Sequence, residues 1–189
     1  MTQSVPEELS MGEHRDIGRR SSESARAELV DVVFRRHYAA LLRLAVVMVG
    51  DRGAAEDAVQ DAFVSLHRNL RALRDPDAAE AYVRSAVLNR CRSWVRRQAT
   101  QRAKRPLLLV REGPRRTPED ATLARDEVGS LVAQMRMLPR RQREVLACRF
   151  VLELSVAETA ALLDIGEGSV KTHTHRGLHA LQQGIEVNR

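Results

Sequence analysis

Residues 138–181 read LPRRQREVLACRFVLELSVAETAALLDIGEGSVKTHTHRGLHAL, and this stretch decides the fold because it specifies two short helices and the turn between them. Ser155 and Glu158 have the spacing of a capping box immediately before the small and apolar run AETAALL. The following DIGEG, residues 164–168, supplies two glycines and two acids, which suit a tight turn leading into the positive end of a new helix. The sequence therefore predicts a helix-turn-helix whose second helix covers about 168–182.

The second helix of this motif has one face suited to packing and another suited to nucleic acid. The packing face is predicted to hold Val170, Thr174, Gly177, Leu178 and Leu181. The remaining surface near the helix start carries hydroxyls, imidazoles and cations, which can meet base edges and phosphates in a major groove. These candidate DNA contacts are Ser169, Lys171, Thr172, His173, His175 and Arg176, with Arg176 the leading one. The alternative is an ordinary helical hairpin with a solvated basic face, but Ala160, Ala161 and Gly177 permit the close helix approach of a helix-turn-helix.

Composition limits the class of partner and the compartment. The 189 residues include 31 Lys and Arg against 25 Asp and Glu, a net charge of +6 that suits a polyanion without separating DNA from RNA or an acidic membrane. No apolar run approaches the roughly 20 residues needed to cross a bilayer, and the first residues lack a signal-peptide segment. We therefore expect no membrane insertion and a cytoplasmic location. Cys91 and Cys148 have no C-x-x-C spacing, which predicts buried, reduced thiols.

The rest of the chain is predicted to be all-α, in two small helical domains joined by a basic flexible linker. Residues 1–24 are polar with no periodicity and are expected to be disordered. Helical periodicity predicts an N-terminal domain over 25–98, with helices over 25–49, 54–73 and from Asp75-Pro76 to about Gln98. The proline-rich basic segment 99–118 reads as the linker. A C-terminal domain over 119–189 begins with a helix capped near Thr117-Pro118, and Leu138-Pro139 starts the next helix.

The third predicted helix changes its electrostatic character partway along. From Ala81 to Arg97 it contains five arginines and no acid, which suits a polyanion, although a solvated basic stripe is an equally simple interpretation.

Two separated motifs resemble the sigma factors of bacterial RNA polymerase, specifically the extracytoplasmic-function (ECF) group within the sigma-70 superfamily. The run AAEDAVQDAFVSLHRNL, 54–70, resembles the helix of that family that binds the polymerase clamp. LPRRQREVLACRF, followed by LS-x-x-E and GSVKT-x-x-x-R, resembles its C-terminal domain. The resemblance covers about 29–181. It implies a sigma factor that binds core RNA polymerase, melts the minus-ten promoter element with its N-terminal domain and reads the minus-thirty-five element with its helix-turn-helix.

The resemblance also implies roles for individual residues. The polymerase-binding residues would be Asp57, Gln60 and Asp61, whereas Phe63 in the same helix is expected to be core. The minus-ten contacts would be Arg71, Arg74, Arg84, Asn89, Arg90 and Arg92, around the place of a loop that captures a flipped base. Tyr82 and Trp94 are candidates for stacking on bases, but packing is the favoured interpretation for Trp94. The minus-thirty-five contacts would be the residues already assigned to the second helix of the motif.

Some positions depart from the family pattern. Glu153 stands where a glycine is frequent before the LS pair, Gly166 replaces the usual Ser or Thr cap of the DNA-reading helix, and His173 stands where arginine is common. The resemblance further implies an anti-sigma factor as a partner, which would cover the polymerase-binding faces.

Two other classes of protein compete with the sigma factor. A stand-alone helix-turn-helix regulator that binds operator DNA would explain residues 138–181 but leaves the helix over 54–70 and the arginine-rich helix unassigned. An enzyme is not expected, because the chain has no Gly-rich phosphate loop after a strand and no nucleophile elbow. His173 and His175 are two apart on a helix and point about 200° apart, so the chain is predicted to hold no metal. Because these enzyme motifs are missing, no cofactor and no catalytic residue are expected either.

Overall fold

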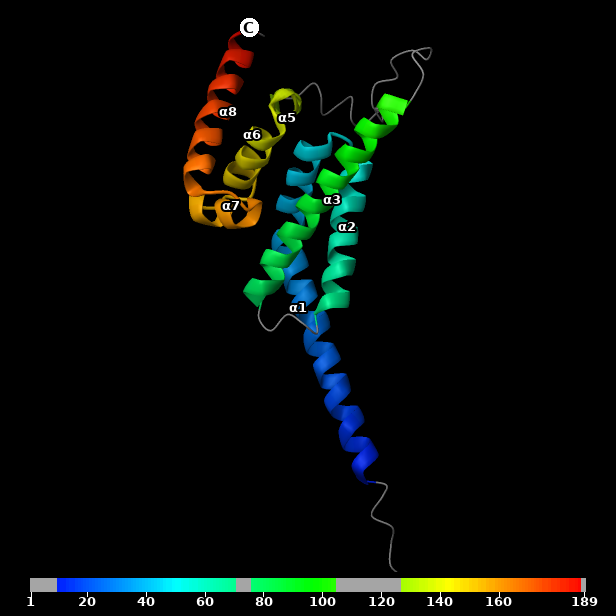
Figure 1. Ribbon diagram of the computed structural model, residues 1–189. Helices are drawn as coiled ribbons and strands as arrows, with labels where there is room; N and C mark the ends of the chain where they lie inside the picture. The colour runs from blue at the N-terminus through cyan, green and yellow to red at the C-terminus, as the bar shows by residue number, and fades with distance from the viewer. Residues whose placement is uncertain (1–9, 71–75, 105–126, 188–189) are drawn as a thin grey trace, which may run out of the picture.

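The computed structural model describes residues 10–70, 76–104 and 127–187, and within these ranges it is helical with no strand, which confirms the all-α prediction. Figure 1 shows the N-terminal bundle, made of α1, α2 and α3, beside the C-terminal bundle, made of α5 to α8. The N-terminal elements are α1 (Ser10–Val49), α2 (Arg52–Asn69) and α3 (Pro76–Lys104). The C-terminal elements are α5 (Glu127–Met137), α6 (Arg140–Leu146), the π-helical turn η2 (Ala147–Val151), α7 (Val156–Leu163) and α8 (Glu167–Val187).

The N-terminal bundle is organised by the turn that separates its first two helices. Gly50 follows α1 with φ +73°, a left-handed conformation that glycine adopts without strain, and its N–H bonds the Val46 carbonyl at 2.8 Å. Asp51 then caps α2 by accepting a hydrogen bond from the Ala54 N–H at 2.7 Å. The predicted end of the first helix at residue 49 is therefore confirmed.

Three helix ends differ by five or more residues from the sequence-based expectation, and one of them is the end of α8, at Val187 rather than near residue 182. α1 begins at Ser10, although disorder was predicted through residue 24; after Pro6 no proline interrupts the chain, so the helix continues beyond its packed part. α3 continues to Lys104 and so includes the first residues of the predicted linker, since the first helix breaker after it is Pro106. Residues 1–9 and the rest of the linker lie outside the described residues, as does the predicted cap near Thr117.

The C-terminal bundle is built around α6 and α8. Pro139 precedes α6 and, as predicted, restarts the chain after Leu138. Gly177 of α8 lies directly on Leu146 of α6, where a Cβ atom at Gly177 would be 2.8 Å from Leu146 Cδ1. This contact confirms that the small residue permits close helix approach. The π-helical turn after α6 was not predicted from the sequence.

The two bundles also pack against one another. Buried apolar residues of α1 and α3, such as Val49 and Val87, belong to the same continuous core cluster as Leu138 and Leu146 from the C-terminal bundle. Figure 1 shows α6 on the side of the C-terminal bundle that faces the N-terminal bundle, with α8 beyond it. Cys91 and Cys148 are both free and buried, as predicted, and burial raises the pKa of each thiol to about 12.

Candidate nucleic-acid interface

The turn into α8 is fixed by local hydrogen bonds on both sides. Ser155 caps α7 through the predicted capping box, in which Ser155 N–H donates to Glu158 at 2.7 Å and Glu158 N–H donates to Ser155 Oγ at 3.1 Å. These bonds hold the pKa of the Glu158 carboxyl below its usual value. Asp164 ends α7 in the left-handed conformation, and the Gly166 carbonyl accepts from Ser169 and Val170 at the start of α8. The predicted helix-turn-helix is confirmed.

The position of each α8 residue around the helix axis explains its exposure. At about 100° per residue, Gly177 and Leu181 lie within about 20° of the fully buried Val170 and face α6. The candidate DNA contacts Ser169, Lys171, Thr172, His175 and Arg176 lie roughly 100° or more from Val170 and are all exposed. Leu178 lies about 80° from Val170, at the edge of the packed face, so it is 40% exposed rather than packed as predicted.

Two of the candidate contacts are less available than the others. His173 lies about 60° from Val170, is half-buried, and has a buried Nδ1 atom with no hydrogen-bond partner. The Thr172 hydroxyl donates to the Gly168 carbonyl at 2.9 Å, so it offers an acceptor rather than a free donor. Arg176 and Lys171 form no ion pair with any residue that the structure describes, which leaves both cations available to an anionic ligand.

The residues that the resemblance assigned to the minus-ten element are mostly held by neighbours within the protein. Arg84 donates to Glu80 at 3.1 Å, and Arg90 donates to Ser65 at 2.6 Å with its Nε 3.6 Å from Asp61. Asn89 is exposed and accepts a 3.4 Å hydrogen bond from Arg92. Arg71 and Arg74 lie outside the described residues.

Arg92 has the least expected partner. Its Nε and Nη2 atoms donate to the two carboxylate oxygens of Glu144 at 2.9 and 3.0 Å, which joins α3 to α6 across the two bundles. Arg140 and Arg141 donate to the same carboxylate at 2.8 and 3.1 Å. Burial by itself would raise the pKa of Glu144, but the hydrogen bonds and charges of Arg92 and Arg140 outweigh it and lower the pKa. Glu144 was not singled out from the sequence; the one available signal was an acid within the basic run RRQRE.

The residues assigned to the polymerase lie on the solvent side of α2. Asp57, Gln60 and Asp61 are exposed, so the described part of the chain leaves that face of the helix open. Phe63, on the opposite face, is 6% exposed and packs 5.0 Å from the Phe34 ring, which confirms its predicted core role.

The aromatic residues of α3 are also part of the packing. Tyr82 and Trp94 are partly buried against the core, and the Tyr82 hydroxyl accepts from Asn69 at 2.8 Å. The packing interpretation of Trp94 is therefore confirmed.

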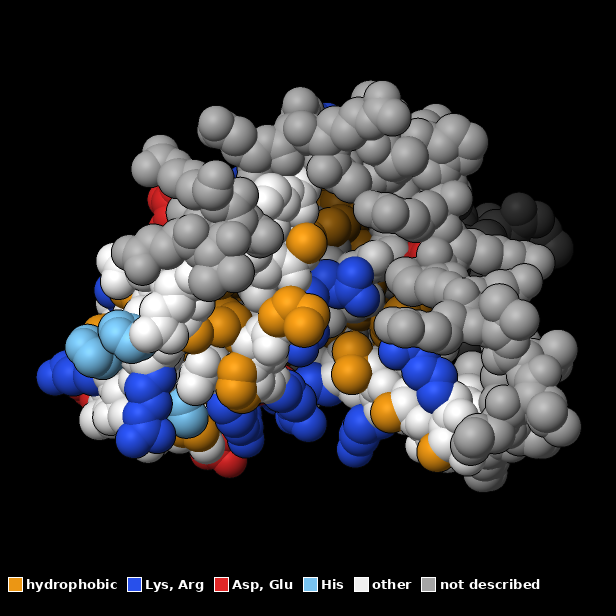
Figure 2. Space-filling view, turned by 90° about the horizontal axis from the view of Figure 1, so that it is seen from above, with side chains coloured by type: hydrophobic (Ala, Val, Ile, Leu, Met, Phe, Trp, Pro, Cys, Tyr) orange, Lys and Arg blue, Asp and Glu red, His pale blue; other side chains and the backbone are white. Residues whose placement is uncertain are grey.

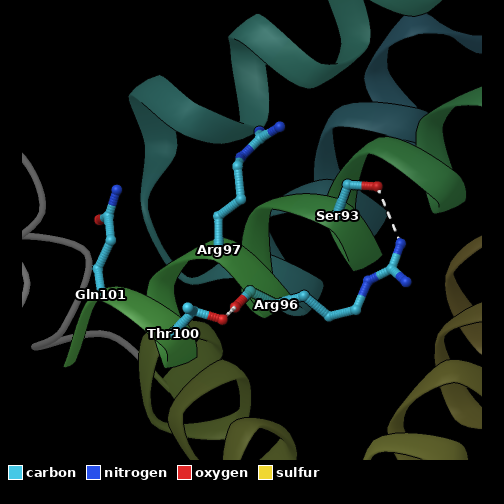
Figure 3. A pocket seen from close by; sticks show the side chains of 5 residues that line it. All are labelled: Ser93, Arg96, Arg97, Thr100 and Gln101. Carbon is cyan, nitrogen blue, oxygen red and sulfur yellow. Dashed lines mark hydrogen bonds between the residues drawn. The ribbon is translucent and has the colours of Figure 1, made fainter. Parts of the chain in front are cut away.

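Basic side chains gather where α3 ends and where the bundles meet. Figure 2 shows Lys and Arg side chains across the middle of the face seen from above. A hollow on α3 is lined by Ser93, Arg96, Arg97, Thr100 and Gln101. In Figure 3, Arg96 lies along the helix and donates to Ser93 at 3.3 Å, whereas Arg97 points away from it. This part of the arginine-rich helix is thus exposed and cationic, as a polyanion-binding surface requires.

Together, these features define a two-part helical protein whose C-terminal part contains a helix-turn-helix with an exposed, basic face on α8. Family models match both parts: Sigma-70 region 2 over residues 33–101 and Sigma-70, region 4 over residues 129–181. The ECF RNA polymerase sigma factor SigM of Mycobacterium tuberculosis is 32% identical over 166 residues, covering 84% of this chain and 82% of SigM. The RNA polymerase sigma-E factor of Streptomyces coelicolor is 30% identical over 146 residues, covering 77% and 80%.

Solved structures show the same fold. CnrH in complex with the cytosolic domain of CnrY superposes with a TM-score of 0.65 at 21% identity, covering 88% of this chain and 98% of CnrH. The sigma factor RpoE of Bartonella quintana, in complex with the anti-sigma factor NepR, gives a TM-score of 0.63 at 18% identity, covering 82% and 97%.

The chain belongs to the ECF sigma factors of bacterial RNA polymerase, within the sigma-70 family. Its function is promoter-specific initiation of transcription through RNA polymerase, in a family of non-catalytic initiation factors. No helix of the described residues is long and apolar enough to cross a membrane.

Proposed function

We propose that the C-terminal bundle reads the minus-thirty-five element and that α8 is the helix that enters the major groove. The observation that carries this proposal is the division of α8 into a face packed on α6 and an exposed face that bears Lys171, His175 and Arg176. Recognition helices of this motif contact base edges with residues near their N-terminus. Ser169 and Thr172 complete the contacts, while the half-buried His173 lies at the margin of this surface.

The N-terminal bundle is proposed to act on core polymerase and on the minus-ten element. The exposed acids and amide of α2, Asp57, Gln60 and Asp61, suit a basic surface on the polymerase clamp. Asn89 and the arginines of α3 suit the backbone of a displaced strand, once their internal partners are exchanged for phosphates. The 25–98 and 119–189 domains would then be the two working units, with no catalytic residue, metal or cofactor of their own, and the protein would act in the cytoplasm.

An anti-sigma factor is the proposed negative regulator. CnrH and RpoE are named in complexes with CnrY and with the anti-sigma factor NepR, and both share this fold. A protein that covers the exposed face of α2 would compete with polymerase for it. The test is a competition between core polymerase and a co-purifying protein for this chain. Repeating it with the α2 variant Asp61→Arg asks whether both partners bind the exposed face of α2.

The decisive experiment is in vitro transcription with purified core polymerase and a library of promoter fragments. We expect initiation at defined start sites only when the protein is present, and alignment of the responsive fragments should reveal the two promoter elements. If the protein bound specific duplex DNA but never core polymerase, a stand-alone regulator would replace this proposal.

The Arg176→Ala variant tests the role of α8. If Arg176 contacts a base, binding to the responsive promoter should weaken by about 1–3 kcal/mol, with a smaller loss on DNA that has a scrambled minus-thirty-five element. His179→Ala is the matched control, because His179 is exposed on the same helix but lies further from its N-terminus. An equal loss on both DNAs would make Arg176 a phosphate contact.

A further inference from the structure

Three of the six histidines of the chain lie close together on α8, at positions 173, 175 and 179. At about 100° per residue, His175 lies about 140° and His179 about 180° around the helix axis from the buried Val170. Both histidines therefore lie on the side of α8 opposite α6, and both are exposed. His173 lies on the other side of the helix, near the packed face. Two imidazoles thus share the solvent face of α8.

The spacing of His175 and His179 is that of a metal-binding pair on a helix. Residues four apart lie one turn above each other, with Cβ atoms about 5–6 Å apart. Zinc proteases use two histidines at this spacing to bind one ion. No other two histidines in the sequence are four residues apart. The prediction of no metal was based on His173 and His175, which point about 200° apart, whereas His175 and His179 are only about 40° apart.

Both imidazoles of this pair are available to a ligand. Neither forms a hydrogen bond or an ion pair with any residue that the structure describes. By contrast, the His37 ring lies 2.9 Å from the Glu80 carboxylate, and His173 has its Nδ1 atom buried. His175 and His179 can therefore each turn a ring nitrogen toward a common ion, and water would complete the coordination.

The charges around the pair select the class of ion. Figure 2 shows His side chains next to Lys and Arg side chains at the edge of the molecule where α8 lies in Figure 1. Residues 171–183 contain two cations, Lys171 and Arg176, and no acid. Mg²⁺ and Ca²⁺ are bound mainly by carboxylate and carbonyl oxygens, and this stretch supplies no carboxylate. Imidazole suits Ni²⁺, Cu²⁺ and Zn²⁺, so an ion of this class is the one that can bind despite the nearby positive charges.

We propose that His175 and His179 bind one divalent transition-metal ion of this class, and that the bound ion keeps α8 out of the major groove. The inference rests on the proposed role of α8 in reading the minus-thirty-five element. The ion takes up a ring nitrogen of His175, a candidate base contact, and its water shell fills space that a base edge would occupy. It is a dissociable ligand from solution, and neither the fold nor initiation depends on it.

The first test is titration of the full chain with NiCl₂, followed by calorimetry, with MgCl₂ as the control ion. His179→Ala breaks the pair, whereas His67→Ala removes a lone exposed histidine of α2. A third variant combines His179→Ala with Ala180→His, which keeps the number of histidines but turns the second imidazole to about 140° from His175. We expect one Ni²⁺ to bind per wild-type pair, about tenfold more weakly in both variants that break the pair, and unchanged in His67→Ala.

The second test measures affinity for duplex DNA that carries the minus-thirty-five element found by transcription. At a free Ni²⁺ concentration ten times its Kd, competition should weaken wild-type binding about tenfold, whereas Mg²⁺ at the same concentration should not. Both variants that break the pair should bind this DNA normally without Ni²⁺ and lose less affinity when it is added, because His179 is not a proposed DNA contact.

The remaining outcomes are distinct. Equal Ni²⁺ binding by all variants would overturn the proposal, since it would place the ion elsewhere on the chain. Ni²⁺ binding at the pair that left the DNA affinity unchanged, or raised it through the added positive charge, would overturn the exclusion of α8 from the groove. A wild-type chain that bound Ni²⁺ at the pair but did not prefer this DNA over a scrambled duplex without Ni²⁺ would instead refute the proposed reading role of α8.

Discussion

Replacing Gly177 by alanine tests whether close contact between α6 and α8 positions α8, the helix proposed to read DNA. A Cβ atom at Gly177 would lie 2.8 Å from Leu146 Cδ1 and 3.1 Å from Leu146 Cγ. Leu146 is 1% exposed and cannot move away without disturbing the core. Such overpacking costs about 1–3 kcal/mol. The gain in helix propensity from Gly to Ala offsets about 1 kcal/mol of this cost.

Gly184→Ala in the same helix provides the matched control. Its Cβ would lie 3.6 Å from Gln134 Oε1, an ordinary van der Waals contact, so the propensity gain should appear without a clash. We expect Gly184→Ala to raise the free energy of unfolding by up to about 1 kcal/mol. Gly177→Ala should lie about 1–3 kcal/mol below this control.

The assay is urea unfolding followed by far-UV circular dichroism, with promoter binding measured on the folded variants. Gly177→Ala should also weaken binding to the minus-thirty-five element, because α8 must shift away from α6 to relieve the contact. Equal stabilisation by both alanines would refute the reasoning, since it would mean that Leu146 moves away from the new Cβ atom without lowering the free energy of unfolding.

Glu153 adopts φ +56° at an exposed position, so Glu153→Gly should stabilise the protein by up to about 1 kcal/mol in the same urea assay, and a loss of stability would contradict the assigned strain. The lowered pKa of Glu144 means that its contribution to stability is fully present above the ordinary carboxyl value of 4.5 and is lost as pH falls through the lower folded-state pKa. The difference in unfolding free energy between wild type and Glu144→Gln should therefore shrink on acidification below about pH 4, and a constant difference would show that the charge does not matter. Cys91 and Cys148, with pKa values raised to about 12 by burial, should resist alkylation at neutral pH until denaturant is added, and rapid labelling of the native protein would contradict their burial.

The local features of this protein could be predicted from its sequence because they depend on neighbouring residues. The capping box of Ser155 and Glu158, the glycine turn at Gly50 and the helix restart at Pro139 each follow from hydrogen bonds or backbone restrictions within a few positions. The angular repeat of a helix likewise predicted which residues of α8 face solvent. The same repeat gives the angles of His173 and Leu178 relative to Val170. Only the position of α6 shows that these angles place His173 near the packed face and Leu178 at its edge.

The tertiary structure alone decided what the arginines of α3 contact. The run of arginines without acids along α3 predicts a basic stripe. The partner of Arg92, however, is Glu144, which lies far along the chain on another helix. No local pattern encodes an ion pair at such a separation, because it forms only when two independently specified helices pack side by side. The sequence by itself thus determined the helices, the family and the exposed face of α8 that we propose contacts DNA, whereas packing between the bundles determined that a predicted DNA contact, Arg92, is held by a buried carboxylate.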